Sequence, residues 1–139
     1  MVQSSGNSRS NANPFVVDDR QWPLIRISSP TSSVNVESFF EIIDKCLQKK
    51  AVFASVHDIR GLPALDALQR KKFAEYIKSR HANLQRFISA HAVVVRSSIE
   101  RGVVTAVLWL SPAPFPVRVF ESPADAEEWA REQLAKFSR

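Results

Sequence analysis

Short apolar runs alternate with longer amphipathic segments along most of the chain, and this pattern predicts strands and helices in turn. The runs at 15–17 and 22–27 are rich in aromatic and branched residues and flank four polar residues, which is typical of a hairpin. The continuous apolar runs at 51–56 and 90–95 lack the polar alternation of a half-exposed strand. They therefore predict strands buried on both faces, and 117–120 predicts a last strand.

Helical spacing of apolar positions predicts a first and a second helix. Asn35 is a candidate N-cap for the first, whose apolar face consists of Val36, Phe39, Phe40, Ile43 and Leu47. A turn at 57–63 leads into the second, which carries apolar residues on one side at Leu65, Leu68, Phe73, Tyr76 and Ile77. Whether the second helix ends near His81 or continues through Phe87 stays open.

Two more helices are predicted in the second half of the chain. Segment 97–110 begins with capping serines but contains β-branched residues, and we interpret it as a helix with an inward stripe of Ile99, Val103, Ala106, Val107 and Leu110. Ser122 followed by Pro123 is a strong helix start. The last helix is expected to bury Ala126, Trp129, Ala130, Leu134 and Phe137.

The order of these elements predicts an α/β fold, because parallel neighbouring strands need a crossover connection and helices supply it. We expect a mostly parallel five-stranded sheet with an N-terminal hairpin and about four helices, formed by residues 14–139. Residues 1–13 are polar and are expected to be a disordered tail.

Composition limits the classes of protein that the chain can represent. With 139 residues, 45% of them hydrophobic and 24% charged, it resembles an ordinary globular domain. No apolar run approaches the roughly 20 residues of a membrane-spanning helix. The start has no apolar signal segment, so we expect a cytoplasmic protein. The single cysteine, Cys46, excludes an internal disulfide and lies at helical spacing with apolar residues, which predicts a buried side chain.

The net charge of +5 is concentrated in one segment, since residues 70–86 contain six basic side chains and one acidic one. A basic face that includes Arg70, Lys71 and Lys78 could bind nucleic acid or an anionic membrane surface. Phe73 and Tyr76 fall on the core side of this helix and do not stack among the charges. A solvated helix face is therefore the favoured interpretation, and nucleic acid is not an expected partner.

Three stretches carry a resemblance to a known family. Residues 51–61 (AVFASVHDIRG) look like a buried strand that ends in Asp and a turn, 90–98 like the next strand with a Ser-rich exit, and 120–129 (FESPADAEEW) like a closing strand-to-helix junction. In this order they resemble the STAS domain of sulphate transporters and anti-sigma-factor antagonists, and the bacterial STAS-like or Sec14-like single-domain proteins. The resemblance covers nearly the whole chain from Phe15 and implies a STAS-like fold and a regulatory function.

One departure from that family concerns regulation. Anti-sigma-factor antagonists begin the second helix with Asp-Ser-Ser-Gly, and a serine there is phosphorylated. The corresponding place in this chain is Asp66-Ala67-Leu68-Gln69, which contains no hydroxyl group. The resemblance therefore implies a module that lacks this phosphorylation switch.

The turn after the second strand is the first candidate site. Asp58, Arg60 and Gly61 follow a buried strand and fall at the carboxyl edge of the sheet, where open α/β sheets bind ligands and partners. Leu62, Leu65 and Asp66 come next, and we expect this segment to bind a protein partner. The alternative is that Asp58 only accepts backbone hydrogen bonds in the turn while Arg60 pairs with it.

A second candidate site is apolar. If 97–110 is helical, Val104, Leu108 and Trp109 exceed what its core stripe requires, and Phe115 joins them after the proline-rich loop. A second copy of the chain, a protein partner or a lipid-like ligand would each cover such a patch. The alternative is that a neighbouring helix and the loop at 112–116 cover it.

The sequence shows no catalytic or cofactor motif. His57, His81 and His91 have no metal-ligand spacing, and the glycines form no phosphate-binding loop. We therefore expect no metal, no cofactor and no enzymatic activity. The leading hypothesis is a non-enzymatic regulatory interaction module, and the main alternative is a Sec14-like domain that binds a lipid or another small apolar molecule.

Overall fold

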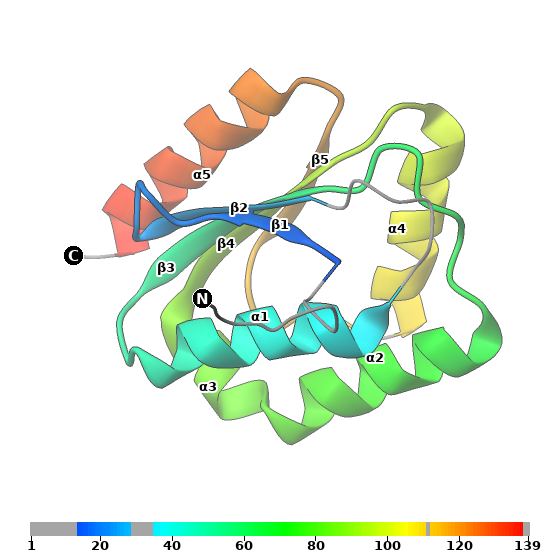
Figure 1. The fold of residues 1–139 in the computed structure, drawn as a ribbon, viewed down its shortest axis with the longest axis horizontal. Coiled ribbons are helices and arrows are strands. Elements are labelled where there is room, and N and C mark those ends of the chain that lie inside the picture. Colours follow the sequence, from blue (N-terminus) through cyan, green and yellow to red (C-terminus); the bar gives the residue numbers. More distant parts are fainter. Residues whose placement is uncertain (1–13, 29–34, 111, 138–139) are drawn as a thin grey trace, which may run out of the picture.

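The computed structural model describes residues 14–28, 35–110 and 112–137. They form five strands and five helices, arranged as a sheet with helices on both faces (Figure 1). In chain order the elements are β1 (Val16–Asp18), β2 (Leu24–Ser28), α1 (Val36–Gln48), β3 (Phe53–Asp58), α2 (Ala67–Ser79), α3 (His81–Phe87), β4 (Ile88–Val94), α4 (Ser98–Leu110), β5 (Val117–Phe120) and α5 (Pro123–Phe137).

The sheet has the predicted class and topology. Its strand order is β1-β2-β3-β4-β5, in which β1 pairs antiparallel with β2 and every later pair is parallel. The carboxyl ends of β2 to β5 therefore lie at one edge. The expected disordered tail at 1–13 lies outside the described residues.

The number of helices differs from the expectation of about four, because the second predicted helix is two helices. Its backbone leaves the helical region at Arg80, between α2 and α3 (φ −116°, ψ 17°). The guanidinium of Arg80 donates to both oxygens of Asp44 on α1, at 2.6 and 3.0 Å, and lies over the ring of Tyr76. This side chain accordingly ties the break in the helix to α1.

Small side chains bring α5 close to one face of the sheet. Ala54, Ala90 and Ala92 from β3 and β4 face Ala126 and Ala130 of α5, and none of the five is exposed. The start of α5 is as predicted, since the Ser122 hydroxyl accepts from the amide of Asp125 at 3.3 Å.

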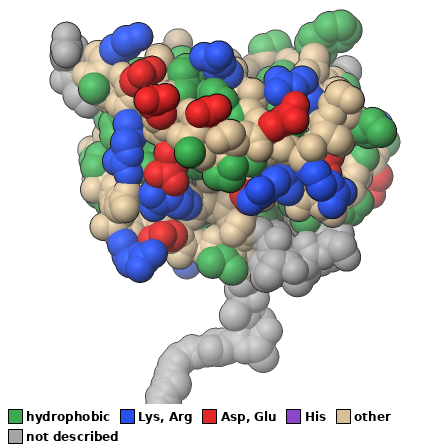
Figure 2. All heavy atoms as spheres, turned by 90° about the horizontal axis from the view of Figure 1, so that it is seen from above, with side chains coloured by type: hydrophobic (Ala, Val, Ile, Leu, Met, Phe, Trp, Pro, Cys, Tyr) green, Lys and Arg blue, Asp and Glu red, His purple; other side chains and the backbone are tan. Residues whose placement is uncertain are grey.

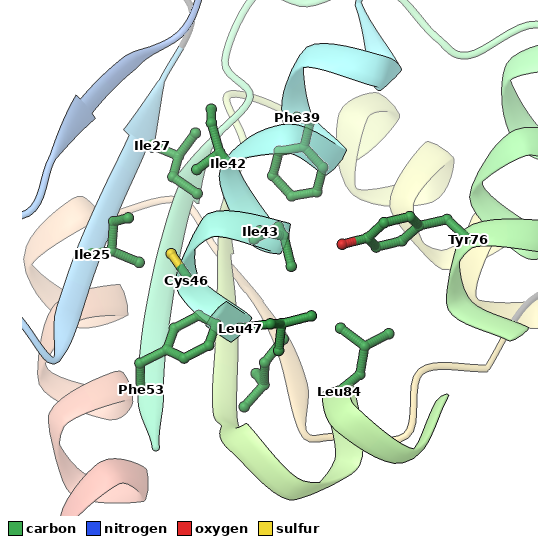
Figure 3. Packing of buried hydrophobic residues seen from close by; sticks show 11 residues of the cluster. Ile25, Ile27, Phe39, Ile42, Ile43, Cys46, Leu47, Phe53, Tyr76 and Leu84 are labelled. Atoms are coloured by element: carbon green, nitrogen blue, oxygen red, sulfur yellow. The ribbon is translucent and has the colours of Figure 1, made fainter. Parts of the chain in front are cut away.

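Larger side chains build the main core on the opposite face, under α1, α2 and α3 (Figure 3). Tyr76 of α2 points toward Ile43 of α1 in this view. Its hydroxyl donates to the Asp44 carboxylate at 2.8 Å, so the one polar tip of the ring is satisfied. The predicted cap of α1 is also confirmed, because Asn35 accepts from the amide of Ser38 at 3.0 Å.

Four residues expected in the core are exposed. Leu68 lies in the first turn of α2 and is 60% exposed, while Phe137 in the last turn of α5 is 40% exposed. Ile99 is 79% exposed, and Ala106 is exposed as well, because α4 turns a different face inward from the one predicted. The side chain of Leu110, also predicted to face inward, lies outside the described residues.

Charged side chains of both signs are mixed over the side of the molecule drawn in Figure 2. Some form ion pairs across elements, such as the one between Arg26 of β2 and Glu127 of α5, at 2.6 Å. Among the described residues, no helix combines the length and the apolar character needed to cross a membrane.

Candidate functional site

An apolar cavity of about 200 Å³ lies between the sheet and α1, α2 and α4. Its walls include Phe39 and Ile43 from α1, Phe73 and Tyr76 from α2, and four residues of α4, namely Val103, Val104, Val107 and Leu108. These α4 positions recur at helical spacing and define the face that the helix turns inward. The space exists because α4 covers this part of the sheet without filling it.

Two histidines on adjacent strands line the cavity on the side of the sheet. His57 of β3 and His91 of β4 alternate with the residues that face α5, so their side chains point to the opposite face. The His57 ring stacks on Phe39, with centroids 4.5 Å apart and planes 12° apart. The Nε2 atom of His57 is buried and has no hydrogen-bond partner within the described structure.

His91 is held in a different way. Its Nδ1 atom is hydrogen-bonded to the hydroxyl of Ser55, at 2.5 Å. Ser55 is fully buried and is not part of the cavity wall, so its hydroxyl is shielded from anything that enters the cavity. The pair therefore orients the His91 ring and does not present an accessible nucleophile.

Both imidazoles are neutral at pH 7. Burial, together with the neighbouring His91, lowers the pKa of His57 to about 3, although Asp58 opposes the shift. Burial lowers the pKa of His91 to about 4. Two uncharged rings therefore line the cavity, and neither offers a positive charge.

The segment of residues 58–68, called the edge segment below, leaves the carboxyl end of β3 beside this cavity. Arg60 binds Asp58 with its side chain, at 2.7 to 3.2 Å, and with its backbone amide, at 3.0 Å. Burial alone would raise the pKa of Asp58, but the hydrogen bonds from Arg60 outweigh it and hold the pKa below the usual value. These contacts match the structural alternative considered for the pair.

Glu100 of α4 connects the edge segment to the next loop. One of its carboxylate oxygens accepts from the amide of Gly61 at 3.1 Å, and the other accepts from the amide of Arg96 at 2.7 Å. Gly61 has a φ of 83°, in the left-handed region that favours glycine. One carboxylate therefore fixes the loops after both β3 and β4.

The edge segment has an inner and an outer side. Leu62 and Leu65 are half-buried and line the cavity. Pro63 and Ala64 also line the cavity but are exposed at the same time, and Leu68 is exposed without being part of the wall, so the outer side is largely apolar. The same short stretch thus forms both a cavity wall and a surface.

A capping box defines the start of α2. Asp66 is the N-cap, accepting from the amide of Gln69 at 2.8 Å, while the Gln69 side chain accepts from the amide of Asp66 at 2.9 Å. Residues 58–70 contain no Ser, Thr or Tyr.

The predicted apolar patch is divided by the structure. Val104, Leu108 and Phe115 line the cavity and are half-buried. Trp109 is 83% exposed and is not part of the cavity wall. Three of the four residues therefore come together around an internal space, and the fourth lies on the outside of α4.

Some side chains of the predicted basic face on α2 bind other groups of the same protein. Arg70 donates to the carbonyl oxygen of Leu65 at 2.6 Å, and Lys72 pairs with Glu37. Lys71 and Lys78 are exposed, and no ion pair joins either of them to another described residue. Two isolated lysines make a weak basis for nucleic-acid binding.

Other reactive groups have structural roles here. Cys46 is buried, as predicted, and burial raises the pKa of its thiol to about 11, which keeps it protonated. Within the described part of the chain, no cluster of three or more His, Cys, Asp or Glu side chains has the arrangement of a metal site.

Known proteins resemble this one in structure but not detectably in sequence. No protein-family model and no curated protein sequence matches the chain. A structure of an uncharacterized DUF3478-family protein from Shewanella loihica, described as having a SpoIIAA-like fold, aligns with a TM-score of 0.57 and 14% identity, over 89% of this chain and 99% of that one.

The fold is SpoIIAA-like. An anti-sigma factor antagonist from Mycobacterium paratuberculosis aligns as well, with a TM-score of 0.51 and 12% identity, over 90% of this chain and 99% of that one. The STAS-like fold predicted from the sequence is therefore confirmed. At such identities the likeness describes the fold alone.

Sequence reasoning missed the two cavity histidines, which it considered only as metal ligands. The available signal was their position within the strands. His57 and His91 alternate with Val56 and Ala92, which face α5, and this places both rings on the other face of the sheet.

We predict that Glu100→Ala loosens the edge segment. Without the carboxylate, the amides of Gly61 and Arg96 lose their acceptor, while the strands keep theirs. Amide hydrogen exchange should become about 10-fold faster at Gly61 and Arg96, in line with the loss of a charge-assisted hydrogen bond. Glu128→Ala, an exposed position on α5, is the control. Unchanged protection at Gly61 would contradict the connecting role of Glu100.

We also predict a pH dependence of stability caused by the buried histidines. The unfolded chain binds protons with a pKa of about 6.5, whereas the folded protein does so only near pH 3 to 4. Stability is therefore full above about pH 6.5 and falls as the pH is lowered. The two groups together should remove about 4 kcal/mol from the free energy of unfolding between pH 7 and pH 5.

Chemical denaturation at several pH values measures this loss. His57→Phe should reduce it by about half, because one titrating ring remains. His81→Phe replaces an exposed histidine on α3 and is the matched control. An equal loss in the wild-type protein and the His57→Phe variant would contradict the assignment.

Proposed function

We propose that this protein is a non-enzymatic regulatory module that binds a protein partner through the edge segment. The supporting observation is the largely apolar, exposed outer side of that segment at the carboxyl edge of the parallel strands. Ligands and partners bind at this edge in open α/β sheets. The SpoIIAA-like fold supports the same function, since one similar structure is named as an anti-sigma factor antagonist.

The edge segment is suited to docking because its backbone is held in place. The Asp58–Arg60 pair closes the turn, Glu100 holds Gly61, and the capping box at Asp66 fixes the start of α2. A preorganised surface loses little conformational entropy when a partner binds. In this proposal Asp58, Arg60, Gly61 and Asp66 shape the surface, and apolar side chains supply the contact area.

Regulation by phosphorylation of the α2 start is not part of the proposal. A kinase requires a hydroxyl group, and residues 58–70 offer none. The signal that changes partner binding must then reach the edge segment by another route.

We predict that Leu68→Asp abolishes partner capture without unfolding the protein. Leu68 is 60% exposed and does not line the cavity, so a carboxylate there changes the docking surface and leaves the core intact. Leu62 would be a poor choice, because it faces the cavity. Tagged protein expressed in its native cells and quantitative mass spectrometry of captured proteins provide the measurement.

Val16→Asp is the matched control, since it makes the same type of change at a residue of β1 that is 53% exposed. A partner should be retained by the wild-type protein and by Val16→Asp, and be at least 10-fold depleted with Leu68→Asp. Equal retention of the partner by both variants would show that the partner does not bind the outer side of the edge segment.

A second candidate function, the binding of a small apolar molecule, is favoured by the cavity itself. Well-packed interiors rarely leave spaces much larger than a water molecule, and this one is about 200 Å³. Pockets of this kind, apolar with few polar groups, are typical of small-molecule sites. A Sec14-like activity would use the same space for a lipid chain.

We predict that native mass spectrometry of protein purified from its own cells detects a co-purifying small molecule. Leu108→Trp, which fills the cavity from α4, should release it, while Trp109→Leu on the exposed side of α4 should not. Retention of the ligand by Leu108→Trp would place its binding site elsewhere.

A further inference from the structure

The two most exposed large apolar side chains in the described part of the chain lie on the outer face of α4. Trp109 is 83% exposed and Ile99 is 79% exposed. Gly102 and Ala106 are exposed between them, and the spacing of the four positions places them on one side of the helix. These four residues, called the α4 strip below, lie on the side of α4 that faces away from the cavity.

Charge does not interrupt the α4 strip. Residues 102–110 contain no charged side chain. Arg101, which adjoins the strip, is held toward β5, because its guanidinium donates to the carbonyl oxygen of Val119 at 3.3 Å and lies 3.7 Å from the carboxylate of Glu121. A helix that is apolar on all sides is normally covered on all sides. The molecule that covers the α4 strip must therefore be apolar at the contact.

The strip is low in its middle and high at its ends. A Cβ atom added at Gly102 would meet no atom within 4 Å, and Ala106, one turn away, carries only a methyl group. Small residues allow two crossing helices to approach closely at one point, and larger side chains fill the wider gap on either side of it. Ile99 and Trp109 stand at those two outer positions. The α4 strip thus has the shape of a surface for a crossing helix.

The order large, small, small, large is the same in both directions along the strip. Two antiparallel copies of α4, related by a two-fold axis level with Val104, place Ile99 of one protomer opposite Trp109 of the other and Gly102 opposite Ala106. A two-fold interface requires such a surface, since the same patch must complement itself. No charge on the strip meets its own copy near the axis. A second copy of this chain therefore matches the strip in both shape and charge.

We propose that this protein forms a weak homodimer in which two α4 helices cross in antiparallel orientation through the α4 strip. Gly102 and Ala106 lie at the crossing point, and Trp109 of each protomer packs against Ile99 of the other. The strip shares no residue with the edge segment, so this inference does not depend on the proposed function.

The size of the contact sets the expected affinity. α4 has 13 residues and is therefore about 20 Å long. Two buried tryptophan rings contribute roughly 300–500 Å², and the rest of the strip brings the buried area to on the order of 1,000 Å². Interfaces of that size belong to weak, reversible complexes. We expect a dissociation constant of roughly 10–100 μM.

Sedimentation velocity of the full chain, at concentrations from well below to well above this constant, tests the proposal. The wild-type protein should pass from monomer to dimer. Trp109→Ala should weaken the dimer at least about 10-fold, because it removes a buried aromatic anchor. Leu68→Ala is the matched control, since it truncates another exposed apolar side chain, 60% exposed, outside the strip. It should leave the dissociation constant unchanged.

Gly102→Leu distinguishes a specific helix crossing from a general attraction between apolar surfaces. Leucine forms helices better than glycine, and the space around Gly102 is open, so the melting temperature of the monomer should rise. In the dimer, the added side chain stands where the helices are closest and should weaken association about 10-fold. Because the monomer becomes more stable, unfolding cannot explain this loss. Tighter association of Gly102→Leu than of the wild-type protein would overturn the crossing geometry.

Cross-linking tests the antiparallel orientation. Equal amounts of the variants Gly102→Cys and Ala106→Cys are mixed and oxidised, and the native Cys46 is buried and does not interfere. The proposed arrangement brings position 102 of one protomer next to position 106 of the other. The mixed disulfide should therefore form faster than the disulfide of either variant with itself. Faster formation of the two unmixed disulfides would overturn the antiparallel orientation.

Two further results would overturn the dimer itself. A wild-type protein that stays monomeric at concentrations well above the expected constant would leave the α4 strip to a different partner. Dimerisation that Trp109→Ala leaves unchanged would place the interface on another surface of the protein.

Discussion

The alternation of small and large side chains along β3 and β4 is the constraint on which the rest of the structure depends. Ala54, Ala90 and Ala92 allow α5 to approach one face of the sheet closely. The opposite face carries the larger side chains Phe53, His57 and His91, and α1, α2 and α4 lie farther from it. Phe53 and Ile88 belong to the packed core of that layer, whereas His91 and His57, which stacks on Phe39 of α1, line the cavity that α4 covers. The apolar cavity is the consequence. The sheet presents the same pleated surface along its whole length, but the helices above it do not cover that surface evenly.

The fold could be predicted from the sequence because its strongest signals are local. Asn35, Ser122 and the uninterrupted apolar runs each specify one boundary through hydrogen bonding or burial, and the order of elements then limits the topology. The inward face of α4 could not be predicted in the same way. Most of that helix is apolar, so periodicity leaves its rotation undetermined, and tertiary contact decides that Val104 and Leu108 face inward while Ile99 does not.

Only part of the candidate site could be predicted from the sequence, for a related reason. The edge segment follows from the rule that loops at the carboxyl ends of parallel strands carry function, and its residues were identified from the sequence. The cavity depends on what is missing between elements distant in the chain, and no pattern of residue types encodes an empty space. His57 illustrates the difference: the sequence shows a lone histidine in a strand, and only the packing around it reveals that Nε2 has no partner.

The edge segment connects the two proposed functions physically. Leu62 and Leu65 form part of the cavity wall, Leu68 lies on the outer surface, and Pro63 is exposed and also lines the cavity. Under the proposed functions, a ligand that moves the wall changes the surface offered to a partner, and thermodynamic linkage requires the partner to change the affinity of the ligand by the same factor. If the module is regulated at the α2 start, which has no hydroxyl group to phosphorylate, another input to the same position in the fold is required. Under the two proposals, occupation of the cavity would be that input, because it would act on the inner side of the segment whose outer side is proposed to bind the partner.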